Sequence, residues 1–220
     1  IGKIILNPTP ATLNEYNRKT EARRRLNRQL ARLRSLPALT QDKTMVSMQA
    51  NIELARDIDG ALNAGAEGIG LLRTEFMFLN RNSLPNEEEQ YTLLKTIVEG
   101  MQGRPVTIRT FDLGGDKLPT LLDRKYSTGA NPMLGLRAVR LSIKEQKLFE
   151  VQLTAILRAS EYGPLKILLP MISSVEQIRQ VKQIINRVMI KLKKRNPSLK
   201  LTMPPLGAMI EIPAAALIAD

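Results

Sequence analysis

Short apolar runs alternate along the chain with longer segments of helical periodicity. Six runs have the length and composition of strands: 44–52, 68–76, 104–112, 134–141, 165–172 and 205–213. Between them, apolar residues recur at helical spacing and predict the helices 53–65, 86–101, 148–155 and 176–192, with a last helix starting at 214. Strands of nearly continuous apolar character that alternate with helices indicate an α/β fold with a parallel sheet covered by helices.

The number of units limits the architecture. A doubly wound sheet and a (β/α)8 barrel both fit the alternation, and a complete barrel has eight units in about 250 residues. The sequence offers six units, so we predict a partial (β/α)8 TIM barrel. Asn86 with Glu89 and Ser173 with Glu176 have the spacing of N-terminal capping pairs for two of the helices.

Residues 1–38 differ from this pattern. A short extended piece is expected to turn at Pro8 and Pro10, and a polar helix is predicted from about Leu13 to Leu33. The stretch "SLPALTQDK" then interrupts the helix. We therefore predict a helical linker over 1–38 and the main domain over 39–220.

The chain contains no cysteine and no histidine. Without cysteine, disulfides, thiolate metal sites and cysteine nucleophiles are excluded, and this fits a reducing compartment, so we expect a cytoplasmic protein. Without histidine, the usual general base and the usual phosphoryl-carrying imidazole are missing. Catalysis would have to rest on other side chains or on a metal, and we expect that the chain does not work alone.

The formal net charge is +12, from 33 basic and 21 acidic residues. Such an excess is typical of proteins with a nucleic acid, an anionic membrane or an anionic small molecule as partner. Much of it lies in 18–34 and 191–200, where leucines at helical spacing in the first segment place the arginines on a solvated face. Because only 4% of residues are aromatic, nucleic acid is not an expected partner. The apolar runs fall short of the roughly 20 residues of a membrane helix, so no membrane span is expected.

Charged residues follow three of the predicted strands. Arg73 and Arg109, each followed by threonine, end the second and third strands, and Glu211 ends the last. In parallel α/β folds the carboxyl ends of the strands lie on one face, where ligands bind. We expect the three charges to converge on one pocket, although an arginine in such a position can also simply pair with an acidic neighbour.

Further cations belong to the same region, namely Arg137 in "GLRAVRL" and Lys117 in "LGGDKLP". Several cations without acidic partners at obvious spacing indicate an anion of high charge density, because guanidinium groups bind phosphate and carboxylate with two hydrogen bonds. The glycines of 111–117 would let the backbone approach a phosphate, or the stretch is a plain loop. Glu211 could pair with an arginine or could bind Mg2+.

Five motifs in order resemble the phosphoenolpyruvate-binding barrel of Enzyme I of the bacterial phosphotransferase system, including its nitrogen-related paralogue. They are "GAEGIGLLRTEFMFLNRNSLPNEEEQ", "VTIRTFDLGGDK", "NPMLGLRAVR", "LLPMISSVEQ" and "AMIEIPAAA". The opening "GKIILNPTP" resembles the linker between the family's phosphohistidine domain and its barrel. Pyruvate phosphate dikinase and phosphoenolpyruvate synthase share the barrel and some motifs, but the linker and "RTEF" favour Enzyme I. A basic regulatory or interaction module is a further alternative.

The resemblance implies a phosphoryl transfer from phosphoenolpyruvate to a histidine of the N-terminal domain and then to a histidine-containing phosphocarrier protein. Arg73 and Arg109 would hold the phosphate, with Arg137 as a further cation, Lys117 as a further phosphate contact and Glu211 as a ligand of Mg2+. The family's phosphorylated histidine, second metal carboxylate, carboxylate-binding arginine and proton-donating cysteine have no counterpart in this sequence. We therefore expect a truncated barrel that is inactive when isolated. Family members dimerise through the barrel, which makes a homodimer possible, and the sugar and nitrogen branches stay open.

Overall fold

The structure is a computed structural model that describes residues 2–79, 81, 83–114 and 135–220. Contacts divide the chain into two compact units. The first consists of Ile1–Ser47 with Asn63–Gly65, and the second of Met48–Leu62 with Ala66–Asp220. The linker boundary after residue 38 stays a prediction.

The first unit contains one long helix, α1 (Pro10–Ala31). Thr9 caps it, since its hydroxyl accepts a hydrogen bond from the Thr12 N–H at 3.2 Å. Pro10 is the first residue of the helix rather than part of a turn, because a proline there lacks only an N–H that would have no helical partner. The leucines of the predicted apolar stripe are about half exposed, including Leu26 at 52% and Leu30 at 51%.

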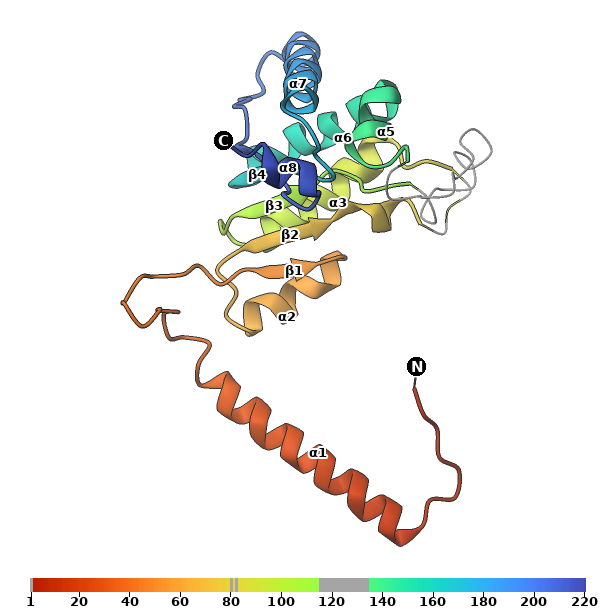
Figure 1. Cartoon of the computed structure of the whole chain (residues 1–220), viewed down its shortest axis with the longest axis vertical. Coiled ribbons are helices and arrows are strands. Elements are labelled where there is room, and N and C mark those ends of the chain that lie inside the picture. The colour runs from red at the N-terminus through yellow and green to blue at the C-terminus, as the bar shows by residue number, and fades with distance from the viewer. Residues whose placement is uncertain (1, 80, 82, 115–134) are drawn as a thin grey trace. The chain divides into compact units, whose positions relative to one another are not determined.

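The second unit is built on a parallel sheet whose strand order follows the chain (Figure 1). Its strands are β1 (Ala50–Ile52), β2 (Ile69–Arg73), β3 (Val106–Arg109), β4 (Leu165–Leu169) and β5 (Leu206–Ala208). Each strand pairs in parallel with the next. The parallel α/β sheet is thus confirmed. An order without reversal is consistent with part of a barrel, whereas a doubly wound sheet reverses its order at a switch point.

Helices connect the strands and cover the sheet. They are α2 (Ile58–Asn63), α3 (Glu87–Gly100), α5 (Val139–Lys144), α6 (Gln146–Ala159), α7 (Val175–Arg195) and α8 (Pro213–Leu217). Helices α3, α6 and α7 pack against one another in that order (Figure 1). The core beneath them holds an aromatic row in which Phe111 packs edge-on against Phe78, at 5.6 Å between ring centroids, and against Phe149, at 6.0 Å. In the part of the chain that the structure describes, no helix is both long and apolar enough to cross a bilayer.

The predicted strand over 134–141 is wrong. Helix α5 begins at Val139, inside that run, and the sheet passes directly from β3 to β4. Val139 and Leu141 are buried as predicted, but a short apolar run has no periodicity that separates a strand from a buried helical turn. The described residues therefore form five strands rather than six.

The first predicted strand is also shorter than expected. It starts at Ala50 instead of residue 44, and the two methionines ahead of it, Met45 and Met48, are 71% and 57% exposed. These apolar side chains do not contribute to the sheet. The second strand, β2, also ends earlier than predicted. It stops at Arg73, and residues Thr74–Met77 form a 3-10 helix.

The capping pair predicted for α3 is confirmed. The Asn86 side chain accepts a hydrogen bond from the Glu89 N–H at 2.9 Å, and the Glu89 carboxylate accepts one from the Asn86 N–H at 2.8 Å. Two backbone donors that the helix cannot pair are thus satisfied.

The pair predicted for α7 is displaced by one residue. Ser174, not Ser173, caps the helix and accepts a hydrogen bond from the Gln177 N–H at 3.4 Å. The Ser173 N–H in turn donates to Oε1 of Gln177 at 2.8 Å. The third helical residue of a capping pair can be glutamine as well as glutamate. Ser173 with Glu176 and Ser174 with Gln177 therefore fit the sequence pattern equally well.

Replacing Asn86 with alanine is expected to lower the free energy of unfolding of the chain by about 1 kcal/mol, the usual loss for a helix cap. Urea unfolding followed by circular dichroism measures this. The matched control is Asn186→Ala, which changes an exposed asparagine inside α7 and should be neutral or slightly stabilising. Equal losses in the two variants would contradict the capping role.

Candidate functional site at the carboxyl ends of the strands

Arg73 and Arg109 lie side by side. They are register partners at the last paired position of β2 and β3, and Arg109 also pairs in register with Leu168 of β4. Because the strands are parallel, both arginines stand at the carboxyl edge of the sheet, as the sequence predicted.

Glu211 lies three residues beyond β5, at the same edge. Its Oε1 accepts a hydrogen bond of 2.7 Å from the backbone N–H of Met171, which follows β4. Met171 is buried and has a φ of 57°, a left-handed conformation that costs a non-glycine residue about 1–2 kcal/mol. Strained backbone of this kind is common where a site requires a fixed group. Here it aims an N–H at an exposed carboxylate and so orients Glu211.

Arg73 has an acidic partner that the sequence analysis missed. Its Nη1 lies 2.8 Å from Oε1 of Glu53, which follows β1. The side chains are 43% and 38% exposed, and an ion pair this open contributes only about 0–1 kcal/mol. An anion can therefore replace Glu53 as the partner of the Arg73 guanidinium with little loss of free energy.

Arg109 and Arg137 belong to a buried ion cluster, defined here as Glu75, Arg109, Asp112 and Arg137. Arg109 pairs with Glu75 and lies 3.6 Å from the Asp112 carboxylate. Arg137 holds the same carboxylate with two hydrogen bonds, of 2.7 Å from Nε and 3.0 Å from Nη2. All four side chains are at most 9% exposed. The expectation of cations without acidic partners is therefore wrong: two positive and two negative charges neutralise each other.

Gly114, the one glycine of 111–117 that the structure describes, makes room for the cluster. Gly114 has a φ of 153°, and a Cβ built on it would lie 2.6 Å from Cβ of Arg137. The space that the missing side chain leaves is therefore filled by the stem of Arg137. The next segment, including Lys117, lies outside the described residues.

Several buried polar atoms at this edge lack a hydrogen-bond partner among the described residues. They include Nε of Arg109, Oγ1 of Thr110 and Oε2 of Glu75. Buried polar atoms nearly always have a partner, so the end of β3 retains hydrogen-bonding capacity for a further group. Nε of Arg109 and Oγ1 of Thr110 can donate to a phosphate oxygen, whereas Oε2 of Glu75 can only accept a hydrogen bond.

The edge also has a small cavity. It has a volume of about 140 Å³ and is lined by Asn51, Ile52, Glu53, Asp57 and Arg73. The backbone N–H groups of Leu54 and Glu53 donate to Asp57 and hold the pKa of its carboxyl below the usual value. This fixes the loop that carries Glu53 opposite Arg73.

A metal site at this edge would have to use few protein ligands. Among the residues that the structure describes, no cluster of three or more acidic side chains could hold a metal ion. Mg2+ commonly binds to one or two carboxylates and completes its shell with substrate oxygens and water. The single oriented carboxylate of Glu211 fits that pattern.

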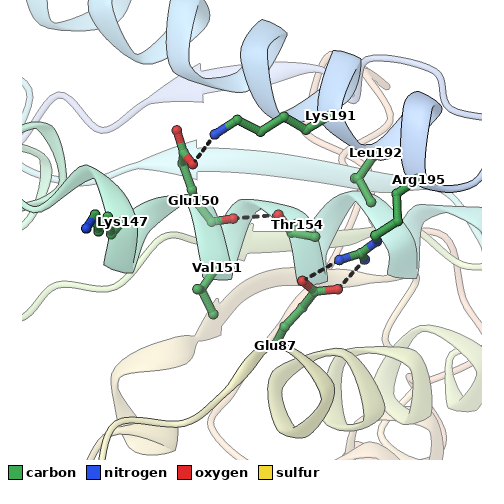
Figure 2. A pocket seen from close by; sticks show the side chains of 8 residues that line it. All are labelled: Glu87, Lys147, Glu150, Val151, Thr154, Lys191, Leu192 and Arg195. Atoms are coloured by element: carbon green, nitrogen blue, oxygen red, sulfur yellow. Dashed lines mark hydrogen bonds and ion pairs between the residues drawn. The ribbon is translucent and has the colours of Figure 1, made fainter.

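A larger cavity, of about 270 Å³, lies away from the strand ends among α3, α6 and α7 (Figure 2). Its charged side chains are largely paired: Lys191 lies 2.6 Å from Glu150, and Arg195 donates to Glu87 at 3.0 Å (Figure 2). Arg195 and Arg158 also hold the pKa of Glu87 below its ordinary value. These internal pairs leave little charge to recruit an anion, so the strand edge is the stronger candidate.

Comparison with known proteins decides the family. The model of the family described as "PEP-utilising enzyme, PEP-binding domain" matches residues 27–220. The chain belongs to this family. The match includes Arg73, Arg109, Arg137 and Glu211, so the strand edge described above falls within the region that defines the family.

Curated relatives within this family are named phosphoenolpyruvate-protein phosphotransferase. The protein of Cupriavidus necator is 43% identical over 218 residues, which cover 99% of this chain and 37% of the relative. That of Bacillus subtilis is 41% identical over 220 residues, or 100% of this chain and 38% of the relative. That of Geobacillus stearothermophilus is 43% identical with 37% of its length covered. The chain thus spans a little over a third of the length of these relatives.

The resemblance recognised from five motifs is therefore confirmed at the level of the family. The roles assigned to single residues stay predictions, because the comparisons name proteins and domains rather than side chains. The structure adds the acidic partners, Glu53, Glu75 and Asp112. Glu53 lies 20 residues from the arginine that it contacts, just after another strand, and no local spacing in the sequence indicates such a pair.

Proposed function

We propose that the chain forms the phosphoenolpyruvate-binding part of a phosphoenolpyruvate–protein phosphotransferase. The observation that supports this best is the register pairing of Arg73 with Arg109, at an edge that also carries Glu211. Arginines at paired positions of neighbouring strands suit a phosphate, and the relatives of that name match the chain over its whole length.

The two arginines would act differently. Arg73, on the exposed side, would exchange its pair with Glu53 for the phosphate of the substrate. Arg109, held from behind by Glu75 and Asp112, would present its remaining N–H as a fixed donor. Arg137 would fix Asp112 and add positive charge, and Lys117 would be a further phosphate contact. Fixed donors avoid reorganisation during the reaction.

Glu211 would hold Mg2+, which supplies neutralisation of the phosphate charge when bound. Phosphoryl transfer depends mainly on positioning and on charge neutralisation. The chain has no histidine, so the phosphoryl group would pass to a histidine of another domain and from there to a histidine-containing phosphocarrier protein. We further propose that the protein is cytoplasmic, that it can dimerise, and that it serves sugar transport or the related nitrogen branch.

A graft tests this proposal. Residues 1–220 replace the matching segment of the Bacillus subtilis relative, which the 41% identity over the whole chain makes feasible. We expect this grafted phosphotransferase to take up the labelled phosphoryl group of phosphoenolpyruvate in the presence of Mg2+ and to lose the uptake with EDTA. The 220-residue chain alone should take up none, because it lacks histidine. A graft that folds, as judged by circular dichroism, but takes up no label would refute the proposal.

A further inference from the structure

Gln152 is a polar side chain in the apolar interior. It lies on α6, next to the buried Leu153, and both are 0% exposed. A buried amide destabilises a protein unless its hydrogen bonds are made, so its partners indicate why a glutamine stands there.

Its partners are the ends of the two strands that carry the arginines. The Phe111 N–H donates to Oε1 of Gln152 at 3.0 Å, and Nε2 of Gln152 donates to Oγ1 of Thr74 at 3.1 Å. The Thr74 hydroxyl in turn donates to the carbonyl oxygen of Arg109 at 2.8 Å. Because a backbone N–H can only donate, the orientation of the amide follows from the network itself.

The network begins where the sheet ends. Arg73 and Arg109 are the last register pair of β2 and β3, and Thr74 already belongs to a 3-10 helix. Beyond that pair, Gln152 and the Thr74 hydroxyl link the two backbones by hydrogen bonds, in addition to the side-chain pair between Arg109 and Glu75. The amide therefore contributes to the position of each arginine relative to the other.

We propose that Gln152 is a positioning residue for phosphoenolpyruvate binding: it aligns Arg73 and Arg109 without touching the ligand. This rests on the proposed function, because it assumes that the two arginines bind the phosphate. Two donors that must meet one phosphate lose affinity when their spacing changes, as small misplacements cost enzymes up to about 100-fold in rate.

The test uses the full 220-residue chain and the variant Gln152→Met, which keeps the shape of the side chain but removes its hydrogen bonds. The arginine Nε–Hε signals of Arg73 and Arg109 are followed by NMR during titration with phosphoenolpyruvate and Mg2+, which measures even millimolar dissociation constants. We expect the variant to raise the dissociation constant about tenfold and to displace the Arg109 signal before any ligand is added.

Gln90→Met is the matched control. Gln90 is another buried glutamine, but its Nε2 donates to the carbonyl of Pro85, just ahead of its own helix α3, at 3.0 Å. Both variants should lower the unfolding temperature, whereas only Gln152→Met should weaken binding. An unchanged dissociation constant in Gln152→Met, or an equal rise in both variants, overturns the positioning role.

Thr74 supplies a second line. Thr74→Val removes the hydroxyl link and should weaken phosphoenolpyruvate binding about as much as Gln152→Met. The double variant should bind no more weakly than either single variant. Thr74→Ser keeps a hydroxyl and should retain the affinity of the unaltered chain. Additive effects would overturn the shared link. If Gln152→Met does not fold, the Thr74 variants decide. If the unaltered chain shows no shift at all, the proposed function fails with the inference, whereas binding that Gln152→Met leaves intact refutes the inference alone.

Discussion

Replacing Arg109 with alanine is expected to destabilise the chain by about 3–5 kcal/mol, the usual loss when one member of a buried ion pair is removed. Arg137 still compensates Asp112, but Glu75, at 2% exposure, loses its positive partner. Urea unfolding of the 220-residue chain, followed by circular dichroism, measures the loss. Loss of phosphotransferase activity in a graft that carries Arg109→Ala would therefore reflect unfolding as well as damage to the site.

A double variant separates charge from shape. Glu75→Gln combined with Arg109→Met removes both charges while filling most of the space, and it should be clearly more stable than Arg109→Ala. Arg109→Lys keeps the charge but loses the planar fork, and should fall between the two. If Arg109→Ala unfolds at the same urea concentration as the unaltered chain, the buried ion cluster does not have the strength inferred here.

Replacing Arg73 with alanine should strongly lower activity but hardly change stability. We expect kcat/KM for phosphoenolpyruvate in the grafted phosphotransferase to fall by about 10²–10³, the size of the loss when one donor to the charge that develops in a reaction is removed. Stability should change by less than about 1 kcal/mol, because the pair with Glu53 is exposed. Steady-state kinetics and urea unfolding of the same preparation give both numbers.

The control for Arg73 is Arg187→Ala. Arg187 is exposed on α7 and donates to Gln146 of α6 at 2.7 Å. Its replacement also removes one arginine contact at the surface, but between two helices rather than at a strand end. It should leave both kcat/KM and stability unchanged. Wild-type turnover in Arg73→Ala would remove this arginine from the phosphate site.

The sequence predicted the sheet well because the relevant signal is local. The strands lie within short, mostly apolar runs bounded by turn residues, and the parallel order then follows from helices of sufficient length between strands. The signal failed at 134–141, where burial of Val139 and Leu141 arises from a short helix. In such a run, packing decides between strand and helix, and packing is not a local property.

The sequence predicted Arg73, Arg109 and Glu211 at this edge of the sheet, but it did not predict which acidic side chains the two arginines contact. Arg73 and Arg109 carry the same Arg-Thr ending, so the sequence makes them look equivalent. Glu75 lies in the 3-10 helix that follows β2. It pairs with Arg109, although Arg73 is only two residues away in the sequence. The register of the sheet sets this choice, and it makes one arginine buried and the other accessible.

The difference in burial has a consequence for how the two arginines respond to their surroundings. Dissolved ions screen exposed charges over about 8–10 Å at physiological ionic strength but hardly reach charges enclosed by protein. Raising the salt concentration would therefore loosen Arg73 from Glu53 while Arg109 stays bound to Glu75. Ionic strength would thus act on the exposed arginine and leave the buried arginine in place.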